Sequence, residues 1–187
     1  MKLLRHGPAG QERPGLIDTD GRIRDLAGVI DDLAGAALGR ASLDRLRQID
    51  PASLPLVAAG TRLGPPVAGT RNFIGVGLNY SDHAAETGAA VPREPLLFNK
   101  APNCIVGPDD DIVVPPGSTK LDWEVELVLV MGAEARRIGG GNRHAHRQLG
   151  GVAHRNGVHG AKVVVGQQPV PDVHLGIARF HPHDVGQ

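Results

Sequence analysis

The chain has 187 residues, 41% of them hydrophobic, enough for about one domain with a buried core. Its 20 Lys and Arg residues balance its 20 Asp and Glu residues, which argues against a basic surface for nucleic acid or anionic lipid. A single cysteine, Cys104, excludes an intramolecular disulfide framework and a cysteine zinc cluster. The first ten residues lack the apolar stretch of a secretory signal, and no apolar run reaches the roughly 18 residues of a membrane span. We therefore expect a cytoplasmic protein that binds neither nucleic acid nor membranes.

Short strands and helices are predicted in the first 60 residues. Residues 16–24 form a predicted β-hairpin around the turn-rich segment 18–21. Apolar residues recur every three or four positions over 26–38, which predicts a helix. A second helix is predicted to follow, with Ser42 as its N-cap.

The amino-acid composition and the positions of glycine and proline divide the chain into four parts. The expected fold class is α+β, mainly β. The parts are a small N-terminal α/β domain (1–60), a Pro- and Gly-rich linker (61–71), a strand-rich domain (72–138) and a His- and Gly-rich tail (139–187). Short apolar runs between glycines and prolines predict four strands in the third part, at 73–78, 95–98, 112–114 and 123–131.

Carboxylates alternate with apolar residues in the last of these predicted strands. Side chains of a strand alternate between its faces, so Asp122, Glu124 and Glu126 share one face. If that face is buried, the clustered negative charges require a cation, and carboxylate oxygens suit Mg²⁺, Mn²⁺ or Ca²⁺. A solvated polar face on an edge strand is an equally open interpretation.

The segment after residue 74 reads as a strand, a turn and a short helix closed by Gly88. His83 and Glu86 are three residues apart and share a helix face, so the carboxylate can orient the imidazole as a general base. A surface pair without chemistry remains the alternative. Gly75 and Gly77 are only a fragment of a dinucleotide fingerprint, because no third glycine follows in register, and we reject a dinucleotide site.

Taken together, these features resemble the fumarylacetoacetate hydrolase family. The resemblance rests on four segments in the family's order and spacing: 77–86 (GLNYSDHAAE), 94–100 (EPLLFNK), 112–115 (IVVP) and 122–127 (DWEVEL). The N-terminal stretch is similar to the small leading domain of bacterial members known as ureidoglycolate lyases or 2,4-diketo-3-deoxy-sugar-acid hydrolases. The resemblance implies that the strand-rich domain is an incomplete mixed β-roll catalytic domain.

The resemblance also implies a metal-dependent hydrolase or lyase that cleaves C–C bonds of a small 2-oxo or 2,4-dioxo acid. Glu124 and Glu126 match two ligands of Mg²⁺ or Mn²⁺. His83, oriented by Glu86, matches the group that activates water. Lys100 matches a family lysine that can face the anionic substrate, and a structural ion pair is its alternative role. Members are commonly homodimers, so a homodimer is expected.

Residues 139–187 depart from the family pattern. They contain no glutamate, seven of the nine histidines and only two acids, and neither acid matches the family aspartate that is the third metal ligand. We favour a break in the reading frame after about residue 138; a genuine His-rich metal-binding tail and a divergent short member with a rebuilt site stay open. The alternative function is a catalytically inactive fragment that serves as a binding or oligomerisation module.

Overall fold

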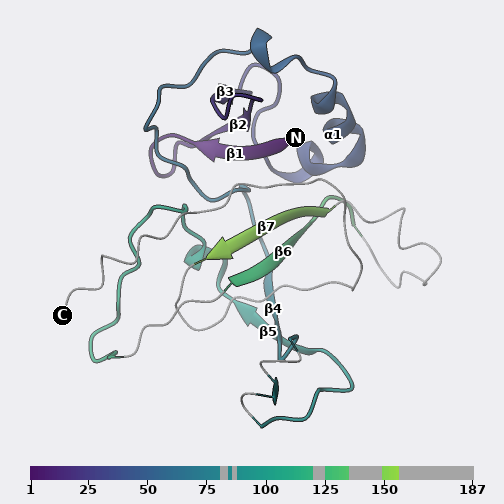
Figure 1. Cartoon of the computed structure of the whole chain (residues 1–187), viewed down its shortest axis with the longest axis vertical. Helices are drawn as coiled ribbons and strands as arrows, with labels where there is room; N and C mark the ends of the chain where they lie inside the picture. Colours follow the sequence, from purple (N-terminus) through teal and green to yellow (C-terminus); the bar gives the residue numbers. More distant parts are fainter. Residues whose placement is uncertain (81–83, 86–87, 120–124, 135–148, 156–187) are drawn as a thin grey trace.

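The computed structural model describes residues 1–80, 84–85, 88–119, 125–134 and 149–155. Its elements, in chain order, are β1 (Lys2–His6), β2 (Arg13–Ile17), β3 (Ile23–Asp25), η1 (Gly35–Leu38), α1 (Arg40–Arg47), η2 (Pro51–Ser53), β4 (Phe73–Gly77), β5 (Leu96–Lys100), η3 (Pro102–Cys104), β6 (Val125–Met131) and β7 (Leu149–Arg155). Figure 1 shows β1–β3 and α1 in the upper part of the molecule and β4–β7 below them. Small sheets with few helices give a mixed α/β architecture, as the expected fold class requires. Within the described stretches, no helix has the length and apolar character needed to cross a membrane.

The N-terminal sheet is antiparallel with the order β1-β2-β3, and the predicted hairpin is confirmed. Ile17 pairs with Ile23 across the turn. The Asp18 carboxylate accepts hydrogen bonds from the Asp20 and Arg22 amides at 3.0 and 2.8 Å, which is how an aspartate stabilises a tight turn.

Both outer edges of this sheet are covered by the chain that follows it. Residues 62–64 run along β1, where the Gly64 amide donates to the Arg5 carbonyl at 2.9 Å. At the other edge, the Val57 amide donates to the Ile23 carbonyl at 2.9 Å. The segment predicted as a linker thus begins as an added edge of the N-terminal sheet, which leaves few unpaired backbone groups there.

The apolar residues at helical spacing are buried, but they do not form the predicted helix over 26–38. The core comprises Leu3, Leu16, Leu26, Ile30, Leu33 and Leu46. Residues 26–38 instead form turns and the 3-10 helix η1. The cause is local, because the Asp25 and Asp32 carboxylates accept hydrogen bonds from the amides of Ala27 and Leu33 at 2.8 and 2.7 Å. Such local side-chain bonds compete with the helical backbone pattern.

Helix α1 begins at Arg40, so the predicted N-cap, Ser42, was wrong. Gly39 is the N-cap and makes no side-chain bond. A side chain at this position would crowd the backbone, since a Cβ on Gly39 would lie 3.1 Å from the Ala36 carbonyl oxygen. Close packing therefore overrides the usual capping preference here.

Among the later strands, the predictions over 73–78 and 95–98 are confirmed by the antiparallel pair β4–β5. The prediction over 112–114 was wrong: these residues pair with no strand in the described parts of the chain, and Val113 is 86% exposed. The strand predicted over 123–131 is confirmed where β6 runs, while residues 120–124 lie outside the described residues. β7, which lies in the His- and Gly-rich tail, pairs antiparallel with β6.

Candidate active site

The structure describes two of the five predicted site residues. Lys100 is the last residue of β5, and Glu126 is the second residue of β6. They therefore stand on different strand pairs, β4–β5 and β6–β7. His83, Glu86 and Glu124 lie outside the described residues.

Glu126 is buried, with only 4% of its surface exposed. On the opposite face of β6, Leu129 is also buried, at 8% exposure. The interpretation of the carboxylate face as a solvated edge therefore does not hold at Glu126. An ionised carboxylate that has left water must be compensated by hydrogen bonds, an ion pair or a cation, so the burial of Glu126 is compatible with the ligand role expected from the sequence.

One face of the β4–β5 pair is built around a glycine. Gly75 pairs with Phe98, and the phenyl ring lies over Gly75, where a Cβ would collide with the ring carbons. Phe73 pairs with Lys100 on the same face, because directly opposed residues of an antiparallel pair share a face. Gly75 is thus required for packing within the sheet, in accord with the rejection of a dinucleotide loop.

The turn after β4 holds an unusual backbone conformation. Leu78 has φ +49°, the single positive φ of a residue other than glycine in the described part of the chain. This conformation costs a leucine about 1–2 kcal/mol. The adjacent Asn79 has buried side-chain nitrogen and oxygen atoms with no hydrogen-bond partner among the described residues. Strained backbone tends to persist at functional sites, and no sequence pattern indicated it here.

Ala84 and Ala85 are helical, and the described residues show the predicted helix end at Gly88. Gly88 has φ +65°, and its amide donates to the Ala85 carbonyl at 3.2 Å. The Ala89 amide reaches back to the Ala84 carbonyl at 2.9 Å. This pair of bonds is the Schellman arrangement that ends a helix at a glycine.

Among the described residues, no group of three or more His, Cys, Asp or Glu side chains is arranged to hold a metal. Of the two expected ligands, Glu126 belongs to the described residues and Glu124 does not. The residue that can be tested, Glu126, fits a divalent cation. It supplies a hard oxygen donor from a buried position on a strand.

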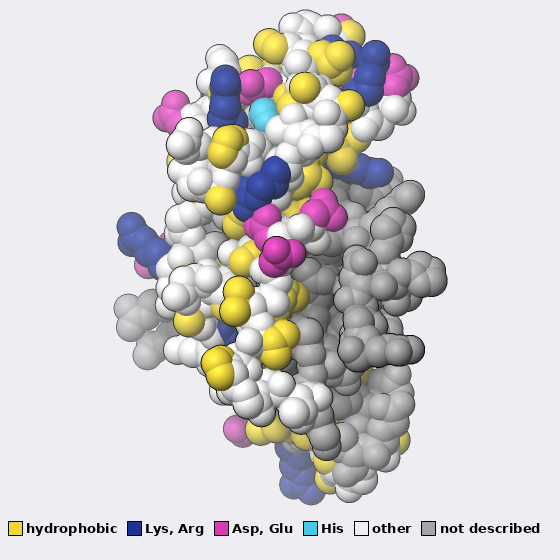
Figure 2. Space-filling view, turned by 90° about the vertical axis from the view of Figure 1, so that its left-hand side faces the viewer, with side chains coloured by type: hydrophobic (Ala, Val, Ile, Leu, Met, Phe, Trp, Pro, Cys, Tyr) yellow, Lys and Arg dark blue, Asp and Glu magenta, His cyan; other side chains and the backbone are white. Residues whose placement is uncertain are grey.

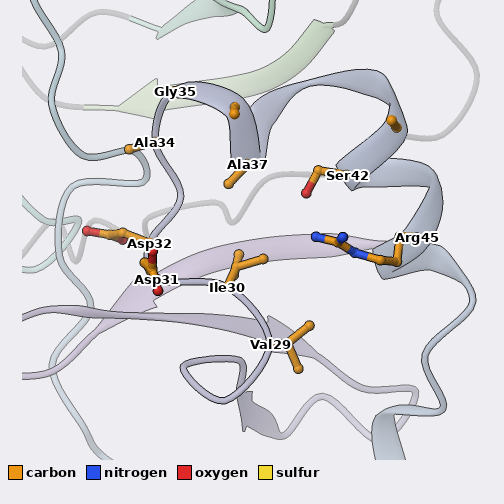
Figure 3. A pocket seen from close by; sticks show the side chains of 11 residues that line it. Val29, Ile30, Asp31, Asp32, Ala34, Gly35, Ala37, Ser42 and Arg45 are labelled. Atoms are coloured by element: carbon orange, nitrogen blue, oxygen red, sulfur yellow. The ribbon is translucent and has the colours of Figure 1, made fainter.

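A hollow of about 710 Å³ lies elsewhere, beside α1 in the N-terminal region (Figure 3). It is lined by small apolar residues together with Asp31, Asp32, Ser42 and Arg45. None of the five predicted site residues is among its lining residues. We therefore place the candidate active site on the strands β4–β6 and not in this hollow.

The strand-borne carboxylate and the motif-bearing turn after β4 lie in a β-rich region whose family is established by comparison. A family profile described as fumarylacetoacetate (FAA) hydrolase C-terminal matches residues 72–171. The chain belongs to this family, whose members generally use a divalent metal ion. The match runs past residue 138, where the resemblance was expected to stop, and includes β7.

Relatives and solved structures agree with this assignment. Proteins of Burkholderia ambifaria and Burkholderia cenocepacia, both described as hydrolases, are 56% identical over 138 residues, which is 74% of this chain and 49% of each relative. An HpcE-type protein from Mycobacterium smegmatis shares 31% identity at a TM-score of 0.59, over 77% of this chain and 51% of that chain. A fumarylacetoacetate hydrolase from Exiguobacterium antarcticum gives the same identity and TM-score, over 78% and 52%. The chain spans about half the length of the curated relatives it matches.

Proposed function

We propose that this chain carries the metal-binding part of a hydrolase or lyase that cleaves C–C bonds of 2-oxo or 2,4-dioxo acids. The observation that supports this best is the buried Glu126 on β6, inside the segment that matches the family. Mg²⁺ or Mn²⁺ is the proposed cofactor, and the subtype suggested by the N-terminal resemblance is a ureidoglycolate lyase or a 2,4-diketo-3-deoxy-sugar-acid hydrolase. A homodimer is the proposed assembly.

Glu124 and Glu126 are the proposed metal ligands, since alternate residues of a strand project to one face. When bound, the divalent ion would act as a Lewis acid that stabilises the negative charge developing on the 2-oxo oxygen of the substrate. The carboxylates fix the position of this charge-stabilising centre within the domain.

His83 and Glu86 are the proposed acid–base pair. His83 takes a proton from water, which then attacks the distant carbonyl carbon of the substrate. Glu86 orients the imidazole and favours its protonated form as the reaction proceeds. Lys100, at the end of β5, is the residue proposed to balance the substrate carboxylate.

The alternative proposal is a catalytically inactive fragment that lacks the third metal ligand. It is favoured by the half-length match to the Burkholderia relatives. Sequencing the coding DNA from the Glu124 codon onward distinguishes the origins of the tail. A family-like continuation in another frame would support a broken reading frame, and its absence would support a genuine tail.

Thermal unfolding with and without Mn²⁺ tests the metal site. We expect Mn²⁺ to raise the Tm of the wild-type chain by mass action, because the ion binds only the folded state. Glu126→Gln should remove this shift. The matched control is Glu134→Gln, which alters an exposed carboxylate just beyond β6 and should leave the shift unchanged. Equal Mn²⁺ shifts in all three proteins would contradict the assignment of Glu126.

Turnover of acylpyruvate-type substrates tests the chemistry. With Mn²⁺ present, His83→Ala should reduce kcat by a factor on the order of 10²–10⁴, the usual contribution of a general base. Undiminished turnover in His83→Ala would show that another group activates the water. Absence of turnover in the wild-type chain, despite a clear Mn²⁺ shift, would favour the inactive fragment.

A further inference from the structure

Five charged side chains of alternating sign form a chain of ion pairs that the proposed reaction does not use. In order they are Asp32, Arg5, Glu12, Arg62 and Asp110. The first four lie in the N-terminal region, within residues 1–64, whereas Asp110 lies in the loop after η3. Partners 48 and 50 positions apart in sequence therefore meet at Arg62.

Arg62 is the residue that joins the two parts. Its guanidinium donates to both carboxylate oxygens of Asp110 at 2.6 Å, a bidentate arrangement. The third nitrogen, Nη1, donates to Glu12 Oε1 at 2.9 Å and to the Gly7 carbonyl at 3.0 Å. All three nitrogens of this rigid fork thus donate to an acceptor.

The loop is also seated by close backbone packing. Gly107 is buried against the Leu63 carbonyl, so closely that a Cβ on Gly107 would collide with that oxygen. The Gly107 amide donates to Asp110 Oδ2 at 2.6 Å. Asp110 therefore ties its own loop together and, through Arg62, ties the loop to the N-terminal sheet.

The electrostatics agree with a persistent contact. The hydrogen bond from Arg62 holds the pKa of Asp110 below its ordinary value, against the opposing effect of burial. Burial acts to raise the pKa of Glu12, but hydrogen bonds and the charges of Arg62 and Arg5 leave it lowered. Both carboxylates are therefore ionised near neutral pH, as the ion pairs require.

We propose that Arg62 and Asp110 act as a clamp that fastens loop 105–110 to the N-terminal sheet. The loop follows directly on η3 and the end of β5, so the clamp also limits the movement of the strand that ends at Lys100. It makes residues 62–64 a rigid junction in place of a flexible connection. The contact between Arg62 and Asp110 does not depend on the proposed catalysis.

Hydrogen–deuterium exchange on the full chain tests the clamp. Asp110→Asn removes the charge that Arg62 contacts, and Asp109→Asn is the matched control, because the adjacent Asp109 is exposed. In Asp110→Asn we expect the amides of residues 103–110 to exchange about tenfold faster than in the control, while those of β1 and β2 exchange at the control rate.

Two results would overturn the clamp: equal exchange of residues 103–110 in the two variants, or an equal acceleration in β1 and β2. Arg62→Lys provides a second test if Asp110→Asn does not fold. It keeps the positive charge but loses the planar fork, so we expect faster exchange over 103–110 by a smaller factor. Unchanged exchange there in Arg62→Lys would equally overturn the proposal.

Discussion

The N-terminal region and the strand pair β4–β5 differ in how far their apolar side chains are buried. The first encloses a leucine-rich core, with Leu26 at 0% and Leu33 at 1% exposure, and covers both edges of its sheet. The second leaves large apolar side chains in solvent, with Leu97 65% and Leu96 49% exposed. Figure 2 shows hydrophobic side chains in both the upper and the lower part of the face it displays, with most of the charged side chains in the upper part.

This contrast shows that the stability of the chain is not spread evenly along it. The N-terminal region buries its own apolar surface. The family-matched region instead holds a buried carboxylate, Glu126, and a leucine with positive φ, Leu78. Backbone strain of the kind seen at Leu78 lowers stability and is tolerated where the surrounding structure holds it in place.

The largest effect is expected from truncating a core leucine. Leu26→Ala should lower the free energy of unfolding by about 2–5 kcal/mol, because it removes buried surface and leaves a cavity. Leu97→Ala, on the exposed side of β5, should change it by under about 0.5 kcal/mol. Urea denaturation of both variants measures the difference. Similar losses in the two would mean that β5 is covered in solution, and the contrast between the regions would fail.

The second-largest loss of stability is expected from a substitution that disturbs the packing within β4–β5. Gly75→Ala should destabilise the chain by about 1–3 kcal/mol, because the new Cβ overlaps the Phe98 ring. Gly77→Ala is the control: its Cβ would lie 3.5 Å from the Leu96 Cβ, an ordinary contact. The double variant Gly75→Ala/Phe98→Ala should show a non-additive loss in the same denaturation assay. Additive losses would rule out the contact.

The third effect is the loss of folding stability at acid pH. The folded-state pKa values of Glu12 and Asp110 are lowered, so their contribution is complete above the unfolded values near 4 and is lost as the pH falls through the folded values. Stability measured between pH 6 and 3 should therefore decline, and Asp110→Asn should decline less steeply than the wild type. Parallel curves would contradict the role of Asp110.

The smallest effect is expected from His6, which is 5% exposed. Burial lowers its pKa, so below the unfolded value of about 6.5 the unfolded chain binds a proton that the folded chain resists. Stability should fall slightly from pH 7 towards pH 5. His6→Gln should flatten this part of the curve, and an unchanged slope would show that His6 does not cause it.

Much of the local structure could be predicted from the sequence. The hairpin around Asp18, the strands β4 and β5 and the helix end at Gly88 follow from turn chemistry and short-range patterns. The candidate site was predicted from motif order and spacing and stays a prediction, because three of its five residues lie outside the described part of the chain. Leu78 could not be anticipated, because no local preference places a leucine at positive φ.

By itself, the sequence determined that Leu26, Ile30 and Leu33 belong to the core, because burial follows the apolar pattern. The backbone over 26–39 was set by contacts that are local but that the apolar pattern does not contain: the hydrogen bonds of the Asp25 and Asp32 side chains and the crowding at Gly39. Only the tertiary structure decided that Arg62 meets an acid 48 residues away. Contacts across such separations depend on the whole chain's packing, which a pattern of neighbours does not contain.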